Sequence, residues 1–390
     1  MNVVVEVYDT ERPLTADVKK DGIHIPIPRP GILNVTPYVA GDSSIPGVRR
    51  IVKLASNEGA LGPSPKAVAA SRGNADSLCR YPDGGCSQLR AALGMRYGLD
   101  PARIVCGAGS DELIGILTRA YAGPGDEVLY SRYAFLMFPI IATANGATPV
   151  PAAERNLTAD VDALLSKQTQ KTRIVYLANP NNPTGTYLPY SEIKRLHAGL
   201  PGNVLLVLDA AYAEYMVAAD YHDGLELARE AENVVVLHTF SKIYALAGLR
   251  LGWGFGSSRI IDVVNRVRGT FNVTATAQLA GLAALEDRAW TEKVRAHTIT
   301  WRRWTVDALR RLGFDVPDGV GNFILCHFAD VADADAADAF LRRRGLIVRK
   351  LGPYSLAGSL RITVGTEEEM RLLVDGLAAY RSGQPRPRAQ

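Results

Sequence analysis

The sequence predicts an α/β fold with two parts: a large domain that has a mostly parallel central sheet flanked by helices, and a smaller α+β domain. The first observation is that short apolar segments alternate with helical patterns from about residue 53 to residue 287. Such alternation is typical of a parallel sheet with helices on both faces. The second observation is that strand-like and helical segments follow in a different order after a long helical region.

The strands expected in the large domain are short and rich in Val, Ile and Leu. They cover residues 104–106, 127–130, 173–178, 204–208, 234–237 and 251–255. Helical patterns lie between most of them, at residues 88–97, 112–121, 190–197 and 260–268. Ligands of such sheets bind beyond the carboxyl ends of the strands, so residues that directly follow these strands are the first candidates for a site.

The rest of the chain divides around this pattern. Residues 1–45 contain repeated Pro and Gly, and we expect an irregular arm that wraps another surface and supplies part of the small domain. For residues 1–20 a disordered extension is the alternative. Residues 46–290 form the expected large domain and residues 291–390 the small C-terminal α+β domain. Beyond a helical region at 275–312, strands are expected at 322–328, 346–348 and 359–364, and helices at 333–344 and 367–380.

The composition argues against several classes of protein. A net charge of +4 arises from 44 basic and 40 acidic residues scattered over 390 positions, which does not favour nucleic-acid binding. The four cysteines show no metal-ligand spacing, so we expect free thiols in a reducing compartment and no metal site. The N-terminus lacks a signal-peptide pattern, and no apolar stretch approaches the ~20 residues of a membrane span. We therefore expect a cytoplasmic protein.

Lys242 is the residue that carries most information about chemistry. It lies just after the apolar segment 234–237, where burial disfavours the charged form of its amine. A desolvated lysine is the usual covalent partner of a carbonyl compound, through a Schiff base. Ser241 beside it and Arg250 further along suggest an anionic group nearby. Together these residues indicate a phosphate-bearing aldehyde, which points to pyridoxal phosphate.

Pyridoxal phosphate needs an acid beside its pyridine nitrogen, and Asp209 is the candidate. Asp209 directly follows the apolar segment 204–208, where an unpaired carboxylate is costly and a pyridinium is a suitable partner. A helix cap or a structural ion pair is the alternative for this residue. Tyr212 follows in the same segment, and its hydroxyl is a candidate donor to the ring 3-oxygen. A packed core tyrosine is the alternative there.

A rigid turn at residues 179–185, with the sequence Asn-Pro-Asn-Asn-Pro-Thr-Gly, directly follows the expected strand at 173–178. Two X-Pro steps and a glycine favour a fixed turn over a flexible loop, and a fixed turn places a side chain accurately. We expect the Asn182 amide to hold the ring 3-oxygen.

Residues 107–112 join a strand to a helix through two glycines. Glycines let the backbone approach a ligand, and a helix N-terminus offers free amides to an anion. With Ser110, Ser241 and Arg250 this segment is a candidate phosphate-binding cup, and it does not fit the nucleotide-binding glycine patterns. Phe135, after the next strand, is a candidate to stack on the cofactor ring, with a core position as the alternative.

The order of these features along the chain resembles the fold-type I pyridoxal phosphate aminotransferases, over about residues 37–378. Within that group the chain is most similar to the histidinol-phosphate aminotransferases. The segments that carry this similarity are 36–38, 54–58, 80–82, the turn at 179–185, 241–252 and 360–365.

The resemblance implies roles for the cofactor-binding residues. Lys242 is the Schiff-base lysine and moves the proton during transamination. Asp209 binds the pyridine nitrogen, while Asn182 and Tyr212 bind the ring 3-oxygen. The residues implied to hold the phosphate are Ser110, Asp111 through its backbone amide, Ser241 and Arg250.

The resemblance also implies a homodimer with shared sites and a set of substrate-binding residues. Tyr81 reaches the cofactor phosphate of the partner subunit. Arg361 clamps the α-carboxylate of glutamate, which suits the bidentate geometry of a guanidinium. Tyr38, Arg349 and Asn182 belong to the substrate end of the site. A solvated surface arginine is the alternative for Arg349.

The implied reaction transfers an amino group between histidinol phosphate and 2-oxoglutarate, giving imidazole acetol phosphate and glutamate, in histidine biosynthesis. Two enzymatic alternatives are an aromatic amino-acid aminotransferase and a decarboxylase of a phosphorylated amino acid. A cofactor-binding transcription regulator is a third alternative, but the first 45 residues lack a helix-turn-helix pattern. One departure concerns the substrate loop, since many relatives read Asn-Glu-Asn-Pro where this chain has Gly59 and Ala60 in the last two places.

Overall fold

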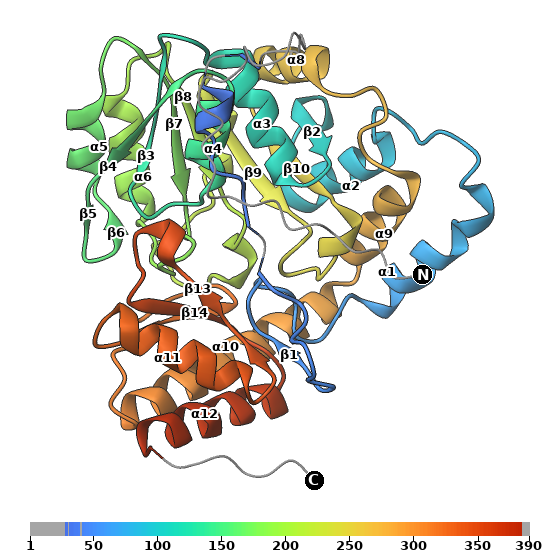
Figure 1. Ribbon diagram of the computed structural model, residues 1–390. Coiled ribbons are helices and arrows are strands. Elements are labelled where there is room, and N and C mark those ends of the chain that lie inside the picture. The colour runs from blue at the N-terminus through green and yellow to red at the C-terminus, as the bar shows by residue number, and fades with distance from the viewer. Residues whose placement is uncertain (1–27, 30, 40, 384–390) are drawn as a thin grey trace, which may run out of the picture.

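A computed structural model of the protein describes residues 28–29, 31–39 and 41–383. Most of the N-terminal arm expected from the sequence lies outside these residues. The described chain forms a large lobe around one sheet and a smaller lobe that contains the C-terminal helices (Figure 1). Among the described residues, none of the helices is both long and apolar enough to span a lipid bilayer.

The central sheet of the large lobe has seven strands in the order β2-β10-β9-β8-β7-β3-β4. All neighbours are parallel except β10, which runs antiparallel to both β2 and β9. The prediction of an α/β fold with a mostly parallel sheet is thus confirmed. The strand bounds are β2 (Ile104–Gly107), β3 (Glu127–Ser131), β4 (Thr148–Ala152), β7 (Thr172–Ala178), β8 (Leu205–Asp209), β9 (Val234–Thr239) and β10 (Gly252–Phe255).

One strand of this sheet was not expected from the sequence. β4 contains Pro149 and Pro151, and a proline cannot donate a backbone hydrogen bond to a neighbouring strand. The sheet tolerates both because β4 is an edge strand, paired only with β3. A small hairpin follows it, formed by β5 (Glu154–Arg155) and β6 (Thr158–Ala159).

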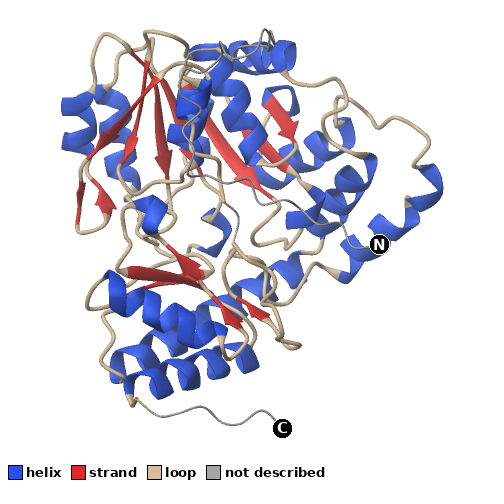
Figure 2. Ribbon diagram, in the orientation of Figure 1, coloured by secondary structure: helices blue, strands red, loops and turns tan. Residues whose placement is uncertain are grey.

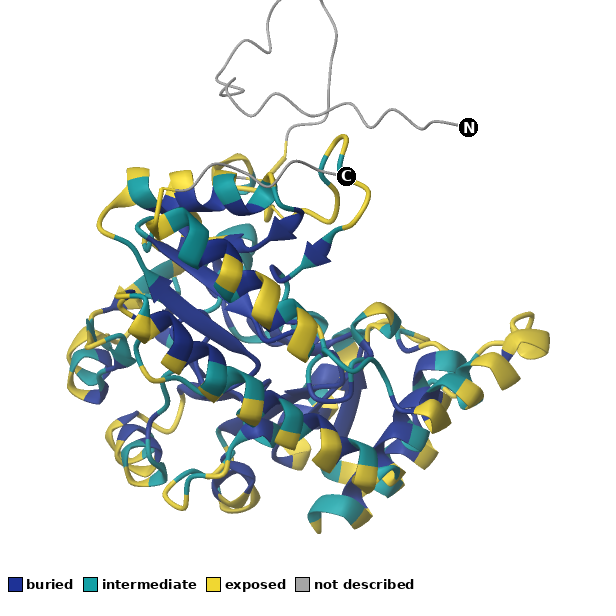
Figure 3. Ribbon diagram, turned by 90° about the horizontal axis from the view of Figure 1, so that it is seen from below, coloured by how far each residue is buried: buried dark blue, intermediate teal, exposed yellow. Residues whose placement is uncertain are grey.

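Helices cover both faces of the central sheet, and each face has its own apolar core (Figure 2). One core includes residues of α2 (Ser87–Tyr97), α5 (Val161–Lys167), α6 (Tyr190–Gly199), α7 (Leu225–Glu230) and α9 (Ala275–Glu286). The other includes residues of α3 (Ser110–Tyr121), α4 (Met137–Ala144) and α8 (Ser258–Val267). The inner strands are therefore buried on both faces (Figure 3), which explains their nearly continuous apolar sequence.

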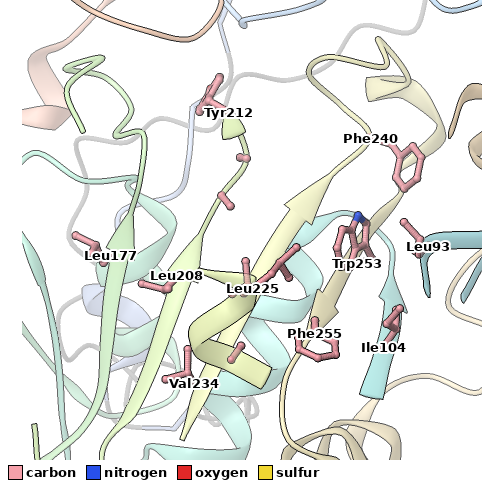
Figure 4. Packing of buried hydrophobic residues seen from close by; sticks show 14 of the residues in the cluster. Leu93, Ile104, Leu177, Leu208, Tyr212, Leu225, Val234, Phe240, Trp253 and Phe255 are labelled. Carbon is pink, nitrogen blue, oxygen red and sulfur yellow. The ribbon is translucent and has the colours of Figure 1, made fainter. Parts of the chain in front are cut away.

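Strand β8 shows how the two cores share one strand. Leu206 and Leu208 belong to the first core, whereas Leu205 and Val207 belong to the second. Successive side chains of a strand point to opposite faces, so this alternation is the expected one. Leu208, Leu225 and Trp253 are among the large apolar side chains of the first core, which extends over several strands of the sheet (Figure 4).

The smaller lobe has a separate core and its own strands. A three-stranded antiparallel sheet has the order β11-β14-β13, and β1 pairs in parallel with β12. The strand bounds are β1 (Val52–Lys53), β11 (Phe323–His327), β12 (Leu346–Ile347), β13 (Arg349–Lys350) and β14 (Ser359–Thr363). The helices are α10 (Arg288–Arg311), α11 (Val331–Arg342) and α12 (Glu367–Arg381), and α1 (Pro65–Gly73) packs on α9 in the large lobe.

The domain boundaries expected at residues 45 and 290 stay predictions. Because β1 pairs with β12 and Leu54 is part of the smaller core, residues 52–54 associate with the smaller lobe rather than the large one. Short 3-10 helices complete the secondary structure: η1 (Ile32–Asn34), η2 (Ala75–Ser77), η3 (Pro101–Arg103), η4 (Ala213–Tyr215), η5 (Ala247–Leu249) and η6 (Gly352–Tyr354).

The carboxyl ends of several strands meet at one edge of the large sheet. β2 leads there into α3, β7 into the turn at 179–185, β8 ends at Asp209, and β9 leads to Lys242. The fold therefore brings together four segments that are far apart in the sequence, at the edge where parallel sheets bind ligands.

Candidate active site

A cavity of about 290 Å³ lies at this edge, with lining residues from both lobes. It collects most of the side chains that the sequence singled out. Those lining it are Tyr38, Ser110, Asp111, Phe135, Asn182, Asp209, Tyr212, Ser241, Lys242, Arg250 and Arg361. Tyr81 and Arg349 do not line it.

Lys242 projects into a setting that weakens its charged form. Its Nζ donates one hydrogen bond, to the carbonyl oxygen of Ser56 at 3.4 Å, and lies 5.7 Å from the ring centre of Tyr212. Burial lowers the pKa of Lys242 to about 8, and the positive charge of Arg361 adds to this effect. Part of the amine is therefore uncharged near neutral pH, which is the nucleophilic form.

Asp209 is a buried carboxyl group, 5 % exposed, that lacks a basic partner. One of its oxygens accepts a hydrogen bond from the Ala211 amide at 3.2 Å, and no basic side chain of the described residues lies within ion-pair distance. Burial, with a smaller contribution from the charge of Asp111, raises the pKa of Asp209 to about 7. A cation bound in the cavity would restore the ionised carboxylate, so this residue fits a protonated pyridine nitrogen.

Tyr212 is oriented by a residue that the sequence did not single out. The Asn57 side-chain amide donates to the Tyr212 hydroxyl at 2.9 Å, and the Asn57 backbone amide donates to the Thr363 hydroxyl at 2.9 Å. Asn322 in turn donates to the carbonyl oxygen of Asn57 at 2.9 Å. No local pattern around Asn57 could have predicted this role, because all these partners are remote in the sequence.

The N-terminus of α3 forms one wall of the cavity. Its N-cap, Gly109, gives no side-chain cap to the first amides, which are free to bind an anion. Arg250 lies against it, donating to the Ser241 hydroxyl at 3.3 Å and approaching the Asp111 carboxylate at 3.6 Å. A Cβ added at Gly252 would come within 2.4 Å of the Ser110 nitrogen, so only a glycine lets the backbone of β10 pass this close to the N-terminus of α3. Cation, hydroxyls and free amides together suit a phosphate.

Glu112 is a second residue that sequence reasoning missed. Its carboxylate accepts hydrogen bonds from the Ala108 amide and from the Asn272 side chain, both at 2.6 Å. These contacts fix the glycine-containing segment that precedes α3. A glutamate in the first turn of a helix is a general signal for such a contact, but its partner Asn272 lies 160 residues further along the chain and is not visible from the local sequence.

Arg361 is a buried guanidinium, 5 % exposed, at the small-lobe side of the cavity. It donates to the Asn182 amide oxygen at 2.5 Å and to the Ala55 carbonyl at 2.8 Å, while its Nε has no partner. Among the described residues no carboxylate lies within ion-pair distance of it. Because a buried cation is costly without a counter-charge, this end of the cavity is suited to an anionic ligand.

Arg349 is buried, only 9 % exposed, so the alternative of a solvated surface arginine is wrong. It donates to the Val39 carbonyl at 2.7 Å, and its guanidinium carbon lies 5.6 Å from the ring centre of Tyr38. Arg349 is also the register partner of Arg361 in the small sheet. It therefore lies behind Tyr38 rather than in the cavity wall.

Tyr81 lies outside this cavity, and 82 % of it is exposed. Its ring stacks on Phe271, with the centres 4.6 Å apart and the planes at 18°. It lines a separate surface hollow between the 74–89 segment and α9. The residue is thus presented outward, away from the cavity of its own chain.

The comparisons with known proteins agree with this geometry. Residues 49–377 match the family described as aminotransferase class I and II. This chain belongs to that family. A histidinol-phosphate aminotransferase of Paramagnetospirillum magneticum is 57% identical over 91% of this chain and 98% of its own length. Another, of Rhodospirillum centenum, is 54% identical over 92% of this chain and 99% of its own length.

A solved structure of the same type is also similar. The histidinol-phosphate aminotransferase of Sinorhizobium meliloti in complex with pyridoxal-5'-phosphate has a TM-score of 0.81 and 27% identity, covering 86% of this chain and 92% of that one. The cofactor of this aminotransferase is pyridoxal phosphate, and the groups around the cavity fit it: an amine, an unpaired carboxyl group and a phosphate-binding corner.

Gly59 stands where many relatives have an asparagine, and the structure gives a steric reason for the small residue. A Cβ at residue 59 would lie 2.5 Å from the Ala245 Cβ and 3.3 Å from the Ala245 Cα. Ala245 itself has a φ of 54°, in the left-handed region that alanine adopts at some cost. Ala245 follows shortly after Lys242, so a larger residue at 59 would displace the segment that carries the lysine.

We predict that Gly59→Asn lowers the free energy of unfolding by about 1–3 kcal/mol, the usual range for overpacking. Adding Ala245→Gly, which removes the clashing methyl group, should recover most of this loss in urea unfolding. Gly202→Asn is the control, because no atom lies within 4 Å of a Cβ at Gly202. Equal losses in Gly59→Asn with and without Ala245→Gly would contradict the steric explanation.

Proposed function

We propose that this aminotransferase exchanges an amino group between histidinol phosphate and 2-oxoglutarate, giving imidazole acetol phosphate and glutamate, as a step of histidine biosynthesis. The observation that carries the proposal is the buried, unpaired Arg361 at the cavity wall, beside Tyr38 and the arginine behind it. The names of the most similar relatives support the choice of substrate. Location in the cytoplasm, expected from the sequence, is part of the same proposal.

When bound, pyridoxal phosphate supplies a carbonyl that accepts the amino group and a ring that draws electrons from the reacting carbon. Lys242 holds the cofactor, and its amine carries the proton to and from the substrate α-carbon. A pKa of about 8 suits this work, because the amine can both accept and release a proton near neutral pH. Asp209 keeps the pyridine nitrogen protonated through its buried negative charge.

The remaining polar groups position the cofactor. The Tyr212 hydroxyl and the Asn182 side-chain amide bind the ring 3-oxygen. Asn182 can do so while its amide oxygen accepts from Arg361, since its NH₂ group stays free to donate. Phe135 packs against the ring. The phosphate is held by Ser110, by the Asp111 amide, by Ser241 and by Arg250.

The substrate end of the site uses the small lobe. Arg361 binds the α-carboxylate of glutamate in a bidentate manner, with Asn182 alongside. Tyr38 and Arg349 serve the phosphate of histidinol phosphate, Arg349 chiefly by holding Tyr38 and by adding positive charge. Because Lys53 and Glu58 form an ion pair at 3.0 Å, the loop that carries Glu58 into the cavity wall is tied to β1 of the same lobe.

We also propose that the enzyme is a homodimer with shared active sites, in which Tyr81 reaches the cofactor phosphate of the partner subunit. Its outward position supports this role, since it cannot serve the cavity of its own chain. Leu78, Phe271 and Leu279 are exposed apolar residues of neighbouring segments and of α9, and contact with a second copy would remove them from water.

Half-transamination of the purified yellow enzyme tests the substrate directly. Each amino donor is added alone, and loss of the visible band is followed for histidinol phosphate, glutamate, phenylalanine and tyrosine. We expect histidinol phosphate and glutamate to react fastest. Faster reaction with phenylalanine or tyrosine would favour an aromatic aminotransferase, and release of carbon dioxide without a keto acid would favour a decarboxylase.

Lys242→Ala should lose the visible absorbance of the purified protein and its turnover, because no other amine lines the cavity wall among the described residues. Lys171→Ala serves as the control and should stay yellow, because this exposed lysine directly precedes β7 and thus lies at the edge of the sheet opposite the cavity. An Lys242→Ala protein that remains yellow after dialysis and keeps its activity would disprove the assignment.

Arg361→Lys should raise the KM for glutamate by about 10- to 100-fold, the effect expected for losing a bidentate charge-assisted hydrogen bond of roughly 1.5–3 kcal/mol. Steady-state kinetics with each substrate varied would measure it. Arg349→Lys is the matched comparison, and it should impair histidinol phosphate more than glutamate. If both variants affect the two substrates alike, the division of the site between carboxylate and phosphate ends is wrong.

A further inference from the structure

A second group of titratable side chains lies outside the active-site cavity, on the face of the central sheet that carries α2 and the first core. His238, in β9, is 1 % exposed and lies between two carboxylates. Its Nδ1 is 3.1 Å from Glu214 Oε1, and its Nε2 is 3.6 Å from Asp223 Oδ2. The transamination described above makes no use of these groups.

The imidazole is held in one orientation by aromatic rings. His238 stacks on Trp253, with ring centres 4.5 Å apart and planes at 5°, and Tyr97 lies 5.9 Å away. The Nδ1–Glu214 contact is a hydrogen bond, whereas Nε2 forms none within the described residues and lies only at ion-pair distance from Asp223, so both carboxylates attract a positively charged ring. The orientation therefore favours a positive charge on this side chain.

The two carboxylates belong to the segment that carries Tyr212. This segment covers residues 212–223. Tyr212 directly precedes η4, which contains Glu214, and Asp223 lies at the other end of the segment, where it accepts a hydrogen bond from the Leu225 amide at 3.0 Å. Within η4 the Tyr215 amide donates to the Tyr212 carbonyl at 3.1 Å, so Tyr212 and Glu214 move together. Arg295 of α10 also donates to the Glu214 carbonyl oxygen.

His238 itself belongs to the strand that leads to Lys242. β9 ends at Thr239, whose hydroxyl accepts from the Ser241 amide at 3.1 Å, and Lys242 follows. The contacts of His238 thus join the two segments that supply the tyrosine hydroxyl and the lysine amine. Because these side chains must meet the same ligand, their relative position matters for the chemistry.

We propose that His238 is a positioning residue: as an imidazolium between Glu214 and Asp223, it fixes the segment that carries Tyr212 against the strand that leads to Lys242. The proposal rests on the roles assigned above to Tyr212 and Lys242 but not on the identity of the substrate. It predicts that the charge of one buried histidine controls the geometry of the site at the carboxyl edge of the sheet.

The surrounding charges support a protonated His238. The groups that face it are Glu214 from η4, Tyr221 and Asp223 from the following segment, Arg96 and Tyr97 from α2, Tyr244 after β9, Arg295 from α10, and Asp209 across the sheet. Burial acts to lower the pKa of His238, but the hydrogen bond and charge of Glu214, with Asp223 and Asp209, outweigh it and raise the pKa.

The sign of the resulting pH dependence follows from linkage. A histidine whose pKa is raised on folding contributes stability that is fully present below its ordinary pKa of about 6.5. This contribution is lost as the pH rises through the raised value in the folded protein. The apo-protein should therefore lose stability between about pH 6.5 and that raised value because of His238, with no further loss from this residue above it.

His238→Gln tests the proposal, since glutamine keeps a donor but carries no charge at any pH. We expect its apo-protein to unfold at lower urea concentration than the wild type at about pH 6, and to lack the alkaline loss of stability. His222→Gln is the matched control: His222 lines the same hollow but is exposed, and no carboxylate contact fixes it. It should retain the wild-type profile.

A second measurement separates positioning from mere stability. With cofactor bound, the pH midpoint of the visible band should move upward in His238→Gln, because a displaced Tyr212 no longer stabilises the anionic ring oxygen. Tyr212→Phe gives the reference shift. A midpoint that moves in Tyr212→Phe but not in His238→Gln would overturn the proposal that His238 positions Tyr212. A midpoint that moves in neither variant would instead contradict the proposed role of Tyr212.

Glu214→Gln offers an independent route should His238→Gln fail to fold, since the substitution preserves shape and removes one carboxylate. It should shift the alkaline loss of stability to lower pH and move the visible band in the same direction as His238→Gln. Unchanged apo-protein profiles and an unchanged band in this variant would overturn the proposal.

Discussion

Three charged groups that the protein does not neutralise lie buried around one cavity, and their desolvation shapes the site. Among the described residues, Asp209 has no cation at ion-pair distance and Arg361 has no anion, and burial lowers the pKa of Lys242 to about 8, so part of its amine is neutral near pH 7. Buried charges without partners are costly in a folded protein. A bound cofactor and substrate would supply the opposite charges and so offset the cost of burying these groups.

The architecture explains how these groups come together. Parallel strands of the large sheet end at one edge, and each ends or continues in a segment that supplies part of the site: β8 supplies Asp209, β9 leads to Lys242, and β2 leads into α3. The smaller lobe then contributes Arg361 from β14 and Tyr354 from η6, while residues 55–58 follow β1 of that lobe. Both lobes are needed to close the cavity, since each supplies lining residues.

Much of the fold was predictable, because the inner strands are buried on both faces and read as apolar runs. The exceptions have physical reasons. β4 contains two prolines that only an edge strand tolerates, and α4 carries Pro139 in its first turn, where no helical hydrogen bond is lost. The site was predictable for side chains that directly follow strands. Asn57 and Glu112 were not, because their partners lie far away in the sequence.

The sequence by itself determined the cofactor, since a lysine, an aspartate and a rigid asparagine turn, each after an apolar strand, match the chemistry of pyridoxal phosphate. Only the tertiary structure decided the pKa values of those groups. A pKa depends on burial and on charges across several elements, and His238 lies beside two carboxylates only because folding brings them to it. Likewise, Gly59 is explained only by Ala245, which is distant in the chain but in contact in space.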